Sequence, residues 1–295
     1  MDSELFIILL PILLAFIMLG LGLETRLSMF LHMMQRPKIV FLTLITHIIF
    51  LPCMAFLLCI TLNAEPYLSV GLMLLAASPS AATSSFFSAH FKANIALNIN
   101  LTVLSSIISL FTLPFVINIS LHYFIGADAL ARFPRNQILL LCLATILPVI
   151  LGILIRLWRP IMANQLARSI RILAPFFLIS LLLFATLQEL SNLKQYIRNI
   201  GMACALFCFC SFFAGYIVPQ LARIQEAQAR ACAFHMGIHN TAIPMTIAIS
   251  IFHDTMLAVP AGLYTLFMFS FAGLFGLILS NRARHFILGN SHLKI

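Results

Sequence analysis

Two polar, proline-containing stretches lie inside long apolar runs of this chain and decide how it can fold. Residues 235–244 read His-Met-Gly-Ile-His-Asn-Thr-Ala-Ile-Pro, and residues 77–85 read Ala-Ser-Pro-Ser-Ala-Ala-Thr-Ser-Ser. Proline frees backbone groups from a helix, and in hydrocarbon these groups must find partners in protein or water. We therefore predict helix breaks at Pro79 and Pro244. A proline kink between packed helices would explain one interruption, but a matching pair indicates a transporter binding site.

The composition around these stretches is that of a membrane protein. Of 295 residues, 62% are hydrophobic and only 8% are charged, and the mean hydropathy is +1.08. A soluble domain has about 25% charged residues. So little charge leaves most of the surface facing the lipid bilayer. We predict an all-α polytopic membrane protein that forms a single membrane domain over residues 1–295.

Nine apolar runs are long enough to cross a membrane, which takes about 20 mainly apolar residues. They cover residues 5–23, 38–61, 67–89, 95–122, 136–157, 170–188, 196–219, 229–252 and 257–281. The third and eighth runs contain the two interruptions, and each is followed by a long apolar helix. This arrangement predicts an inverted repeat of four to five helices.

The positive charges predict an orientation. The net charge is +9, from 17 basic and 8 acidic residues. With the N-terminus outside and nine crossings, 13 basic residues lie on the inner side and 4 on the outer side, as the positive-inside rule expects. We predict a cytoplasmic C-terminus, in a plasma membrane or a bacterial inner membrane. The basic residues would thus form a collar at the inner leaflet of the membrane. Because this placement accounts for the net positive charge, we expect no nucleic-acid partner.

Three histidines are the ionisable residues nearest the centres of the predicted spans: His47, His235 and His239. His235 and His239 are four residues apart and therefore share one helix face. An ionisable residue at mid-membrane depth is a functional hypothesis by default. A neutral histidine that is hydrogen-bonded in a packed core is the alternative, and for His47 alone the two interpretations are equally good.

The fourth run carries a polar face. Asn98, Thr102, Ser105 and Ser109 follow one another at helical spacing. Such side chains can join neighbouring helices through hydrogen bonds, and they can equally line a hydrophilic path. The sequence does not choose between these interpretations.

With these residues the sequence resembles the bile acid:sodium symporter family over about residues 10–280. The matching motifs are loose individually, but they occur in the same order and at similar spacing. They are residues 19–23 (Leu-Gly-Leu-Gly-Leu), His47 with Pro52, residues 78–85, residues 93–98 with Thr102, residues 235–240 and residues 258–260 (Ala-Val-Pro).

The resemblance implies two broken helices that cross at the membrane midplane. It also implies a panel of three helices (5–23, 136–157 and 170–188) that rocks against a core made by the other six runs. Carried over position by position, it implies that nine residues bind substrate or ion: His47, Ser84, Ser85, Asn98, Thr102, His235, His239, Asn240 and Thr241.

The sequence departs from the family pattern at the inferred sodium sites. The family has a Glu at the position of His235 and Gln at those of His239 and His47. It has Asn at the position of Ser85 and Ser at that of Asn98. Sodium prefers oxygen ligands, whereas a neutral imidazole offers one nitrogen lone pair and a charged one repels the ion. These changes argue against ordinary sodium coupling and favour the proton as the coupling ion.

We therefore expect a secondary transporter of an organic anion, bile-acid-like or a small carboxylate, that works by alternating access without a cofactor. An entering anion would stabilise a proton on a buried histidine, so that each charge offsets the cost of burying the other. Two alternatives remain: an uncoupled facilitator, and a transition-metal-binding carrier that uses His47, His235 and His239. The sequence contains no motif for an enzyme and does not predict an oligomeric state.

Overall fold

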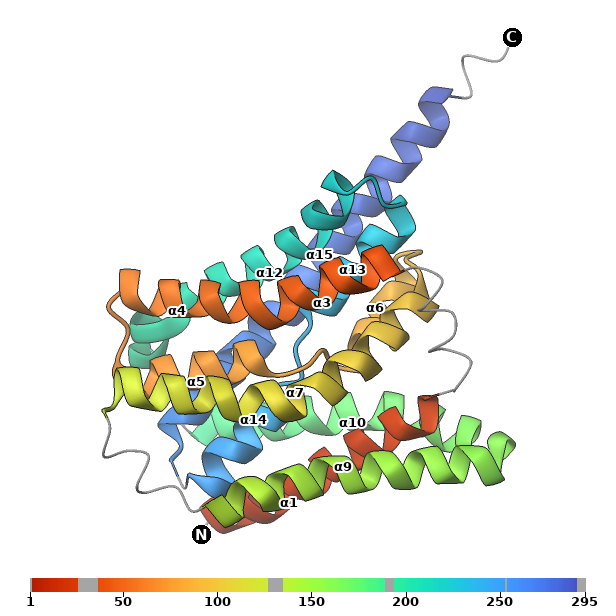
Figure 1. Cartoon of the computed structure of the whole chain (residues 1–295). Coiled ribbons are helices and arrows are strands. Elements are labelled where there is room, and N and C mark those ends of the chain that lie inside the picture. The colour runs from red at the N-terminus through yellow and green to blue at the C-terminus, as the bar shows by residue number, and fades with distance from the viewer. Residues whose placement is uncertain (1, 26–36, 127–134, 189–193, 253, 291–295) are drawn as a thin grey trace.

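The chain is helical throughout the parts that the computed structural model describes, which are residues 2–25, 37–126, 135–188, 194–252 and 254–290 (Figure 1). The elements, in chain order, are α1 (Asp2–Glu24), α3 (Pro37–Ile45), η1 (Thr46–Phe50), α4 (Leu51–Thr61), α5 (Pro66–Ala77), α6 (Thr83–His90), α7 (Ile95–Phe124), α9 (Arg135–Trp158), α10 (Pro160–Gln188), η2 (Ile197–Gly201), α12 (Met202–Leu221), α13 (Glu226–Gly237), α14 (Ala242–Thr246), η3 (Ile247–Ile251), η4 (Met256–Ala258) and α15 (Val259–Asn290).

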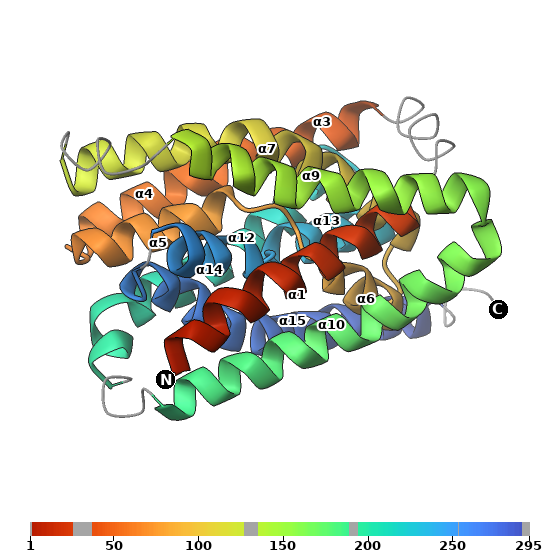
Figure 2. The same ribbon diagram turned by 90° about the horizontal axis from the view of Figure 1, so that it is seen from below.

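The helices form two layers. α1, α9 and α10 lie together along one side of the molecule, and the remaining helices pack above them (Figure 1). Seen from below, the same three helices cover the others, with α1 between α9 and α10 (Figure 2). These three helices coincide with the runs at 5–23, 136–157 and 170–188. The larger layer contains most of the buried apolar side chains, including Phe207, Phe212 and Phe234.

Two of the long apolar runs are each broken into two helices. α5 ends at Ala77, where the backbone of Ser78 turns to an extended conformation (φ −72°, ψ 147°), and α6 begins at Thr83. α13 ends at Gly237, where Ile238 is also extended (φ −112°, ψ 90°), and α14 begins after Thr241. The residues between, 78–82 and 238–241, are called here the two unwound segments.

The unwound segments cross and pair with each other. Ser80 and His239 form an isolated antiparallel bridge. The Ala81 amide donates to the Ile238 carbonyl at 2.9 Å, and the Asn240 amide donates to the Pro79 carbonyl at 2.8 Å. The backbone groups that leave their helices thus satisfy one another, as a low-dielectric interior requires. The prediction of two broken helices that cross is confirmed.

The second break lies upstream of the predicted residue. Pro79 is within the first unwound segment, as expected, but Pro244 follows the second segment and is the third residue of α14. In the first turn of a helix the backbone N–H has no intrahelical partner, so proline costs nothing there. The helix therefore ends at Gly237 because the segment pairs across to 78–82, and Pro244 helps α14 to begin.

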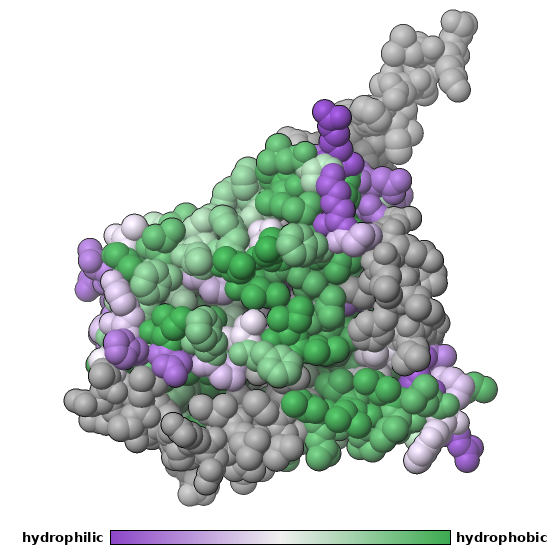
Figure 3. All heavy atoms as spheres, viewed as in Figure 1, coloured by the Kyte–Doolittle hydropathy of each residue, from purple (hydrophilic) through white to green (hydrophobic). Residues whose placement is uncertain are grey.

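The surface confirms an integral membrane protein. Large apolar side chains are well exposed, including Phe111 (77%), Trp158 (78%) and Leu221 (80%), while many polar side chains are buried. Figure 3 shows apolar residues over the middle of one face and hydrophilic residues mainly toward its left and right edges. A continuous apolar band between polar ends is what a lipid-facing surface requires.

Three described helices are long and apolar enough to cross a membrane: Pro37–Thr61, Lys194–Leu221 and Met256–Leu279. The number rises to four if the two parts of α7 count as one span. The broken runs do not qualify, because a half-helix of 12 residues such as α5 rises only about 18 Å, less than a hydrocarbon core of about 30 Å. The count of nine spans stays a prediction.

Two glycines set how closely α1 and α9 approach. A Cβ added to Gly22 would collide with the backbone carbonyl of Val149. A Cβ on Gly152 would lie 2.5 Å from the carbonyl oxygen of Leu19. Small residues at a helix crossing allow such contact between backbones in a membrane protein. The contact gives the Leu-Gly-Leu-Gly-Leu motif at 19–23 a packing role.

We predict that Gly22→Ala lowers stability by about 1–3 kcal/mol, because overpacking at a tight crossing forces the backbones apart. The measurement is the thermal midpoint of the detergent-purified protein, followed by size-exclusion chromatography after heating. Gly273→Ala is the matched control, since a Cβ there meets nothing within 4 Å. Equal midpoints for the two variants would contradict the packing role.

Candidate functional site

Three histidine rings meet where the unwound segments cross. The His47 ring, on η1, lies 5.1 Å from the His235 ring and 5.3 Å from the His239 ring, measured between centroids. All three side chains are buried, with His47 3% exposed and the other two fully covered. Residues from three distant parts of the sequence thus form one cluster, which is called here the histidine cluster.

A single backbone carbonyl fixes two of the three imidazole tautomers. His47 Nε2 lies 3.1 Å from the Ser78 carbonyl oxygen, and His239 Nδ1 lies 3.2 Å from the same oxygen. A carbonyl oxygen only accepts hydrogen bonds, so both of these nitrogens carry hydrogen. The other nitrogens, His47 Nδ1 and His239 Nε2, are buried without a hydrogen-bond partner. Each therefore presents a bare lone pair.

His235 completes the cluster from the last turn of α13. Its Nδ1 lies 3.4 Å from Thr102 Oγ1 on α7, and its Nε2 is buried without a partner. The tautomer of His235 stays open, because a hydroxyl can either donate or accept. The proton acceptors that the hydrogen bonds establish are therefore His47 Nδ1 and His239 Nε2.

Ser84 and Asn98 make hydrogen bonds within the protein. Ser84 Oγ donates to Asn98 Oδ1 at 2.7 Å, and Asn98 Nδ2 donates to the Ala231 carbonyl at 3.0 Å. Ser80 Oγ lies 3.2 Å from Ser84 Oγ and extends the chain to the unwound segment. The Asn98 amide thus joins α6, α7 and α13. Ser85 joins neither the histidine cluster nor this hydrogen-bonded chain, because its hydroxyl donates to the Ala82 carbonyl.

A cleft opens between the three-helix layer and the crossing. About 40 Å³ of it is open to the centres of water molecules, which is room for a few waters. One wall comes from α1 and α10, with Ile17, Gly20, Glu24, Ala167 and Ile170, and the other comes from the crossing, α6 and α15, with Ala81, Ala82, Thr83, His239, Asn240, Thr241, Met268 and Phe269. Most of this lining is apolar, and its polar groups lie at or beside the unwound segments, apart from Glu24 at the end of α1.

Some of the polar groups at the cleft have a hydrogen-bond partner within the protein and others do not. Asn240 Oδ1 accepts the Ala242 amide at 3.2 Å, and Thr241 Oγ1 accepts the Thr265 hydroxyl at 3.0 Å. Thr83 Oγ1 and His239 Nε2 are buried and have no partner. These two atoms are the groups at the cleft that most need a ligand.

Comparison with known proteins places this arrangement in a family. The model of the sodium bile acid symporter family matches residues 11–196, more than half of the chain. The chain belongs to the sodium bile acid symporter family. Membership places it among transporters rather than enzymes. The match ends before α13, so the segment that carries His235 and His239 lies outside it.

Two plant relatives extend the comparison. The probable sodium/metabolite cotransporter BASS1, chloroplastic, of Oryza sativa subsp. japonica is 22% identical over 250 residues, 83% of this chain and 59% of the relative. Its counterpart of the same name in Arabidopsis thaliana is 22% identical over 252 residues, 82% of this chain and 59% of the relative. The chain thus spans about 59% of the length of each of these relatives.

Eight of the nine site residues expected from the sequence lie around the crossing in two groups, and Ser85 on α6 belongs to neither. His47, Ser84, Asn98, Thr102 and His235 face one another inside the larger layer, whereas Asn240 and Thr241 line the cleft. His239 belongs to both groups. In the residues that the structure describes, no three His, Cys, Asp or Glu side chains are placed to hold a metal ion.

Sequence reasoning missed three residues at the site. Glu24 is 7% exposed and lines the cleft from the end of α1. Thr83 was quoted in the first motif but not singled out. Tyr264 donates to the Gly237 carbonyl at 2.8 Å, and its ring lies 5.5 Å from that of His239. Glu24 and Tyr264 lie neither near the centre of a predicted span nor at a position of the family motifs, so the sequence offers no signal for them.

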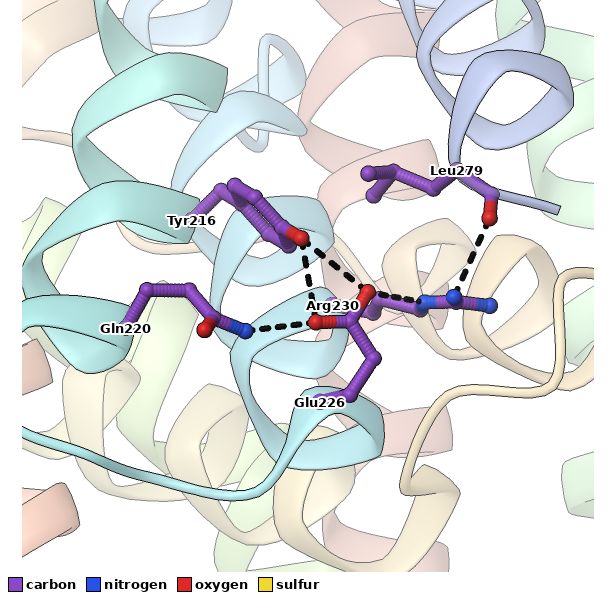
Figure 4. Close-up of polar contacts among 5 residues, drawn as sticks. All are labelled: Tyr216, Gln220, Glu226, Arg230 and Leu279. Atoms are coloured by element: carbon purple, nitrogen blue, oxygen red, sulfur yellow. Dashed lines mark hydrogen bonds and ion pairs between the residues drawn. The ribbon is translucent and has the colours of Figure 1, made fainter. Parts of the chain in front are cut away.

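A polar cluster holds the far end of α13 (Figure 4). Glu226 accepts hydrogen bonds from Tyr216 Oη at 3.0 Å and Gln220 Nε2 at 2.5 Å, both on α12. Arg230 pairs with Glu226 at 2.9 Å and donates to the Leu279 carbonyl of α15 at 3.1 Å. Because α13 is anchored at this end and paired at its other end, it holds His235 at a fixed depth.

We predict that Asn98→Ala lowers stability by about 2–4 kcal/mol, since it removes two buried hydrogen bonds and leaves the Ser84 hydroxyl and the Ala231 carbonyl with fewer partners. The readout is the thermal midpoint in detergent. Asn100→Ala is the matched control on the same helix, because Asn100 Oδ1 is buried without a partner. If both variants lose the same stability, the amide does not join the three helices.

Proposed function

We propose that the chain is a secondary transporter that carries an organic anion by alternating access and uses the proton as its coupling ion. The observation that carries the proposal is a cleft with mainly apolar walls whose lining includes His239, a buried histidine with an unpartnered nitrogen, Nε2. The substrate class is a bile-acid-like molecule or a small carboxylate. The relatives are named sodium/metabolite cotransporters, which supports solute transport in general.

The lining of the cleft suits an amphipathic anion. In this conformation the cleft has room for only a few waters, so a substrate would enter as the two layers move apart. The polar end contains Thr83, Asn240 and Thr241, next to the points where α6 and α14 begin. Helix starts favour negative charge because their first N–H groups point outward. Apolar walls then cover the rest of the molecule.

The histidine cluster supports proton coupling. A proton on His239 Nε2 would place a positive charge at the polar end of the cleft, where an anion would bind. Burial of either charge alone costs roughly 3 kcal/mol on membrane-insertion scales, and the pair offsets this cost. Anion and proton therefore favour each other's binding, which is the thermodynamic requirement for symport.

Sodium is disfavoured by the hydrogen bonds at the crossing. Asn98 Oδ1 accepts from Ser84, and the Asn98 amide nitrogen donates to Ala231. The family positions that supply sodium with Glu and Gln oxygens hold His235, His239 and His47 here. No carboxylate is available at these positions to balance the cation.

The two-layer arrangement supports alternating access. The cleft is lined on one side by α1 and α10 of the three-helix layer and on the other by the crossing, α6 and α15. A tilt of one layer against the other would expose the crossing to one side of the membrane and then the other. The orientation with the N-terminus outside, in a plasma membrane or a bacterial inner membrane, is part of the proposal.

We predict proton-driven accumulation in proteoliposomes, with labelled taurocholate and pyruvate as the two substrate probes. An inwardly directed proton gradient should concentrate at least one probe, and a sodium gradient should not. His239→Ala should lower the initial rate about tenfold or more, since a group at a charged site is typically worth ~1.5–3 kcal/mol. His122→Ala, at an exposed position on α7, is the control and should transport like the unsubstituted protein.

Two outcomes would contradict this function. Equal accumulation under sodium and proton gradients would contradict the role proposed for the histidines in proton coupling. Uptake that only equilibrates the probe under either gradient would establish an uncoupled facilitator instead.

We further predict that the triple variant His47→Gln, His235→Glu and His239→Gln gains sodium dependence, because it restores oxygen ligands at the three positions. Initial uptake of the same probes would be measured with sodium and with choline outside. His235→Ala in place of His235→Glu is the matched control, since it removes the imidazole without supplying a carboxylate. Sodium-independent uptake by a well-folded triple variant would refute the assignment of these positions.

A further inference from the structure

A second pocket lies inside the larger layer and meets the histidine cluster at His47, whereas the cleft meets it at His239. It has room for about one water, with about 10 Å³ open to the centre of a water molecule, and is lined by His47, Ile48, Pro52, Ala76, Ala77, Ser105, Ser109, Thr112 and Val116. None of these residues lines the cleft. The pocket therefore belongs to η1, α4, α5 and α7 and involves no residue of the three-helix layer.

His47 presents its unpartnered nitrogen away from the crossing. Its Nε2 faces the Ser78 carbonyl, and Nδ1 lies at the opposite edge of the ring. That nitrogen is buried, has no partner, and belongs to the one titratable residue among the described residues that line the pocket. Because Ser78 holds the proton on Nε2, the Nδ1 lone pair is free to accept another.

The pocket hydroxyls favour the protonated form of His47. Ser105 Oγ donates to the Thr102 carbonyl at 3.0 Å, and Ser109 Oγ donates to the Ser106 carbonyl at 2.8 Å. A serine hydroxyl has one hydrogen and two lone pairs, so each oxygen can now only accept. A bare Nδ1 gains nothing from such neighbours, whereas an N–H there can donate to them directly or through a water.

We propose that His47, Ser105 and Ser109 form a proton-binding site that is separate from the substrate cleft. Hydronium transfers its proton to the His47 Nδ1 lone pair and leaves as water, and release reverses the step. This assignment rests on the proton coupling proposed above and adds to His239 a second place in the histidine cluster where a proton can bind. A proton on His47 and a substrate in the cleft occupy different cavities, so the core helices can hold both at once.

The neighbourhood of His47 contains few other titratable groups. α13 and its unwound segment contribute the rings of His235 and His239. Cys232 of α13 accepts from Thr43, one turn before His47, at 3.1 Å. Tyr264 reaches the far side of His239. No carboxylate lies among the described lining residues of the pocket, so the hydroxyl oxygens are its means of stabilising a cation.

The test is hydrogen–deuterium exchange at the imidazole C2 position, followed by mass spectrometry of the full-length protein in nanodiscs without substrate. This exchange requires a protonated imidazole and contact with solvent ions. Ser109→Ala and Thr112→Val should each slow exchange at His47 near pH 7. For Ser109→Ala the decrease should be about tenfold, the effect of one hydrogen bond to a charged group. Exchange at His239 should change less than twofold.

Ser120→Ala is the matched control, since Ser120 lies on the same helix and donates to the Val116 carbonyl in the same way, outside the pocket. It should leave His47 unchanged. The assignment is overturned if His47 does not exchange in the unsubstituted protein, if neither pocket variant slows it, or if all three histidines slow together. None of these outcomes depends on transport, so the proposed function can fail or stand separately.

Discussion

The antiparallel pairing of the two unwound segments is the constraint on which the rest of the structure depends. A broken helix in hydrocarbon exposes amides and carbonyls that cost several kcal/mol each if left unpaired. The Ala81 amide and the Asn240 amide each find a carbonyl on the other segment. Neither break could exist without its partner. The fold must therefore bring residues 78–82 and 238–241 together, although more than 150 residues separate them.

The crossing also determines the chemistry around it. A carbonyl released from helical bonding has both lone pairs available, and the Ser78 carbonyl uses them for His47 and His239. This shared acceptor sets two tautomers and leaves one bare lone pair on each ring. The same break that makes room for a substrate thus orients the groups that can take up a proton. The geometry of the site and that of the backbone both follow from the helix break at Ser78.

The sequence predicted the helical fold, both interruptions and the meeting of three histidines, because composition, proline and family motifs carry those signals directly. It misplaced the second break at Pro244, since the end of α13 is set by a long-range pairing that no local pattern encodes. Glu24 and Thr83 reach the cleft through the packing of α1 against the crossing. The sequence left open whether Asn98 joins helices or lines a hydrophilic path, because that depends on side-chain geometry. In the structure its amide joins helices.

A transporter that gives up a bound cation must replace the links that the cation makes between helices. The family resemblance implies oxygen ligands for such a cation from both broken helices and from the helix after the first one. In this chain the Asn98 amide occupies that place and joins α6 to α13 by neutral hydrogen bonds. The histidines take the remaining positions and leave lone pairs, not carboxylates, at the crossing. In the proposed proton-coupled carrier, one set of residues would hold the helices together and another would bind the ion, whereas a bound cation would combine the two tasks.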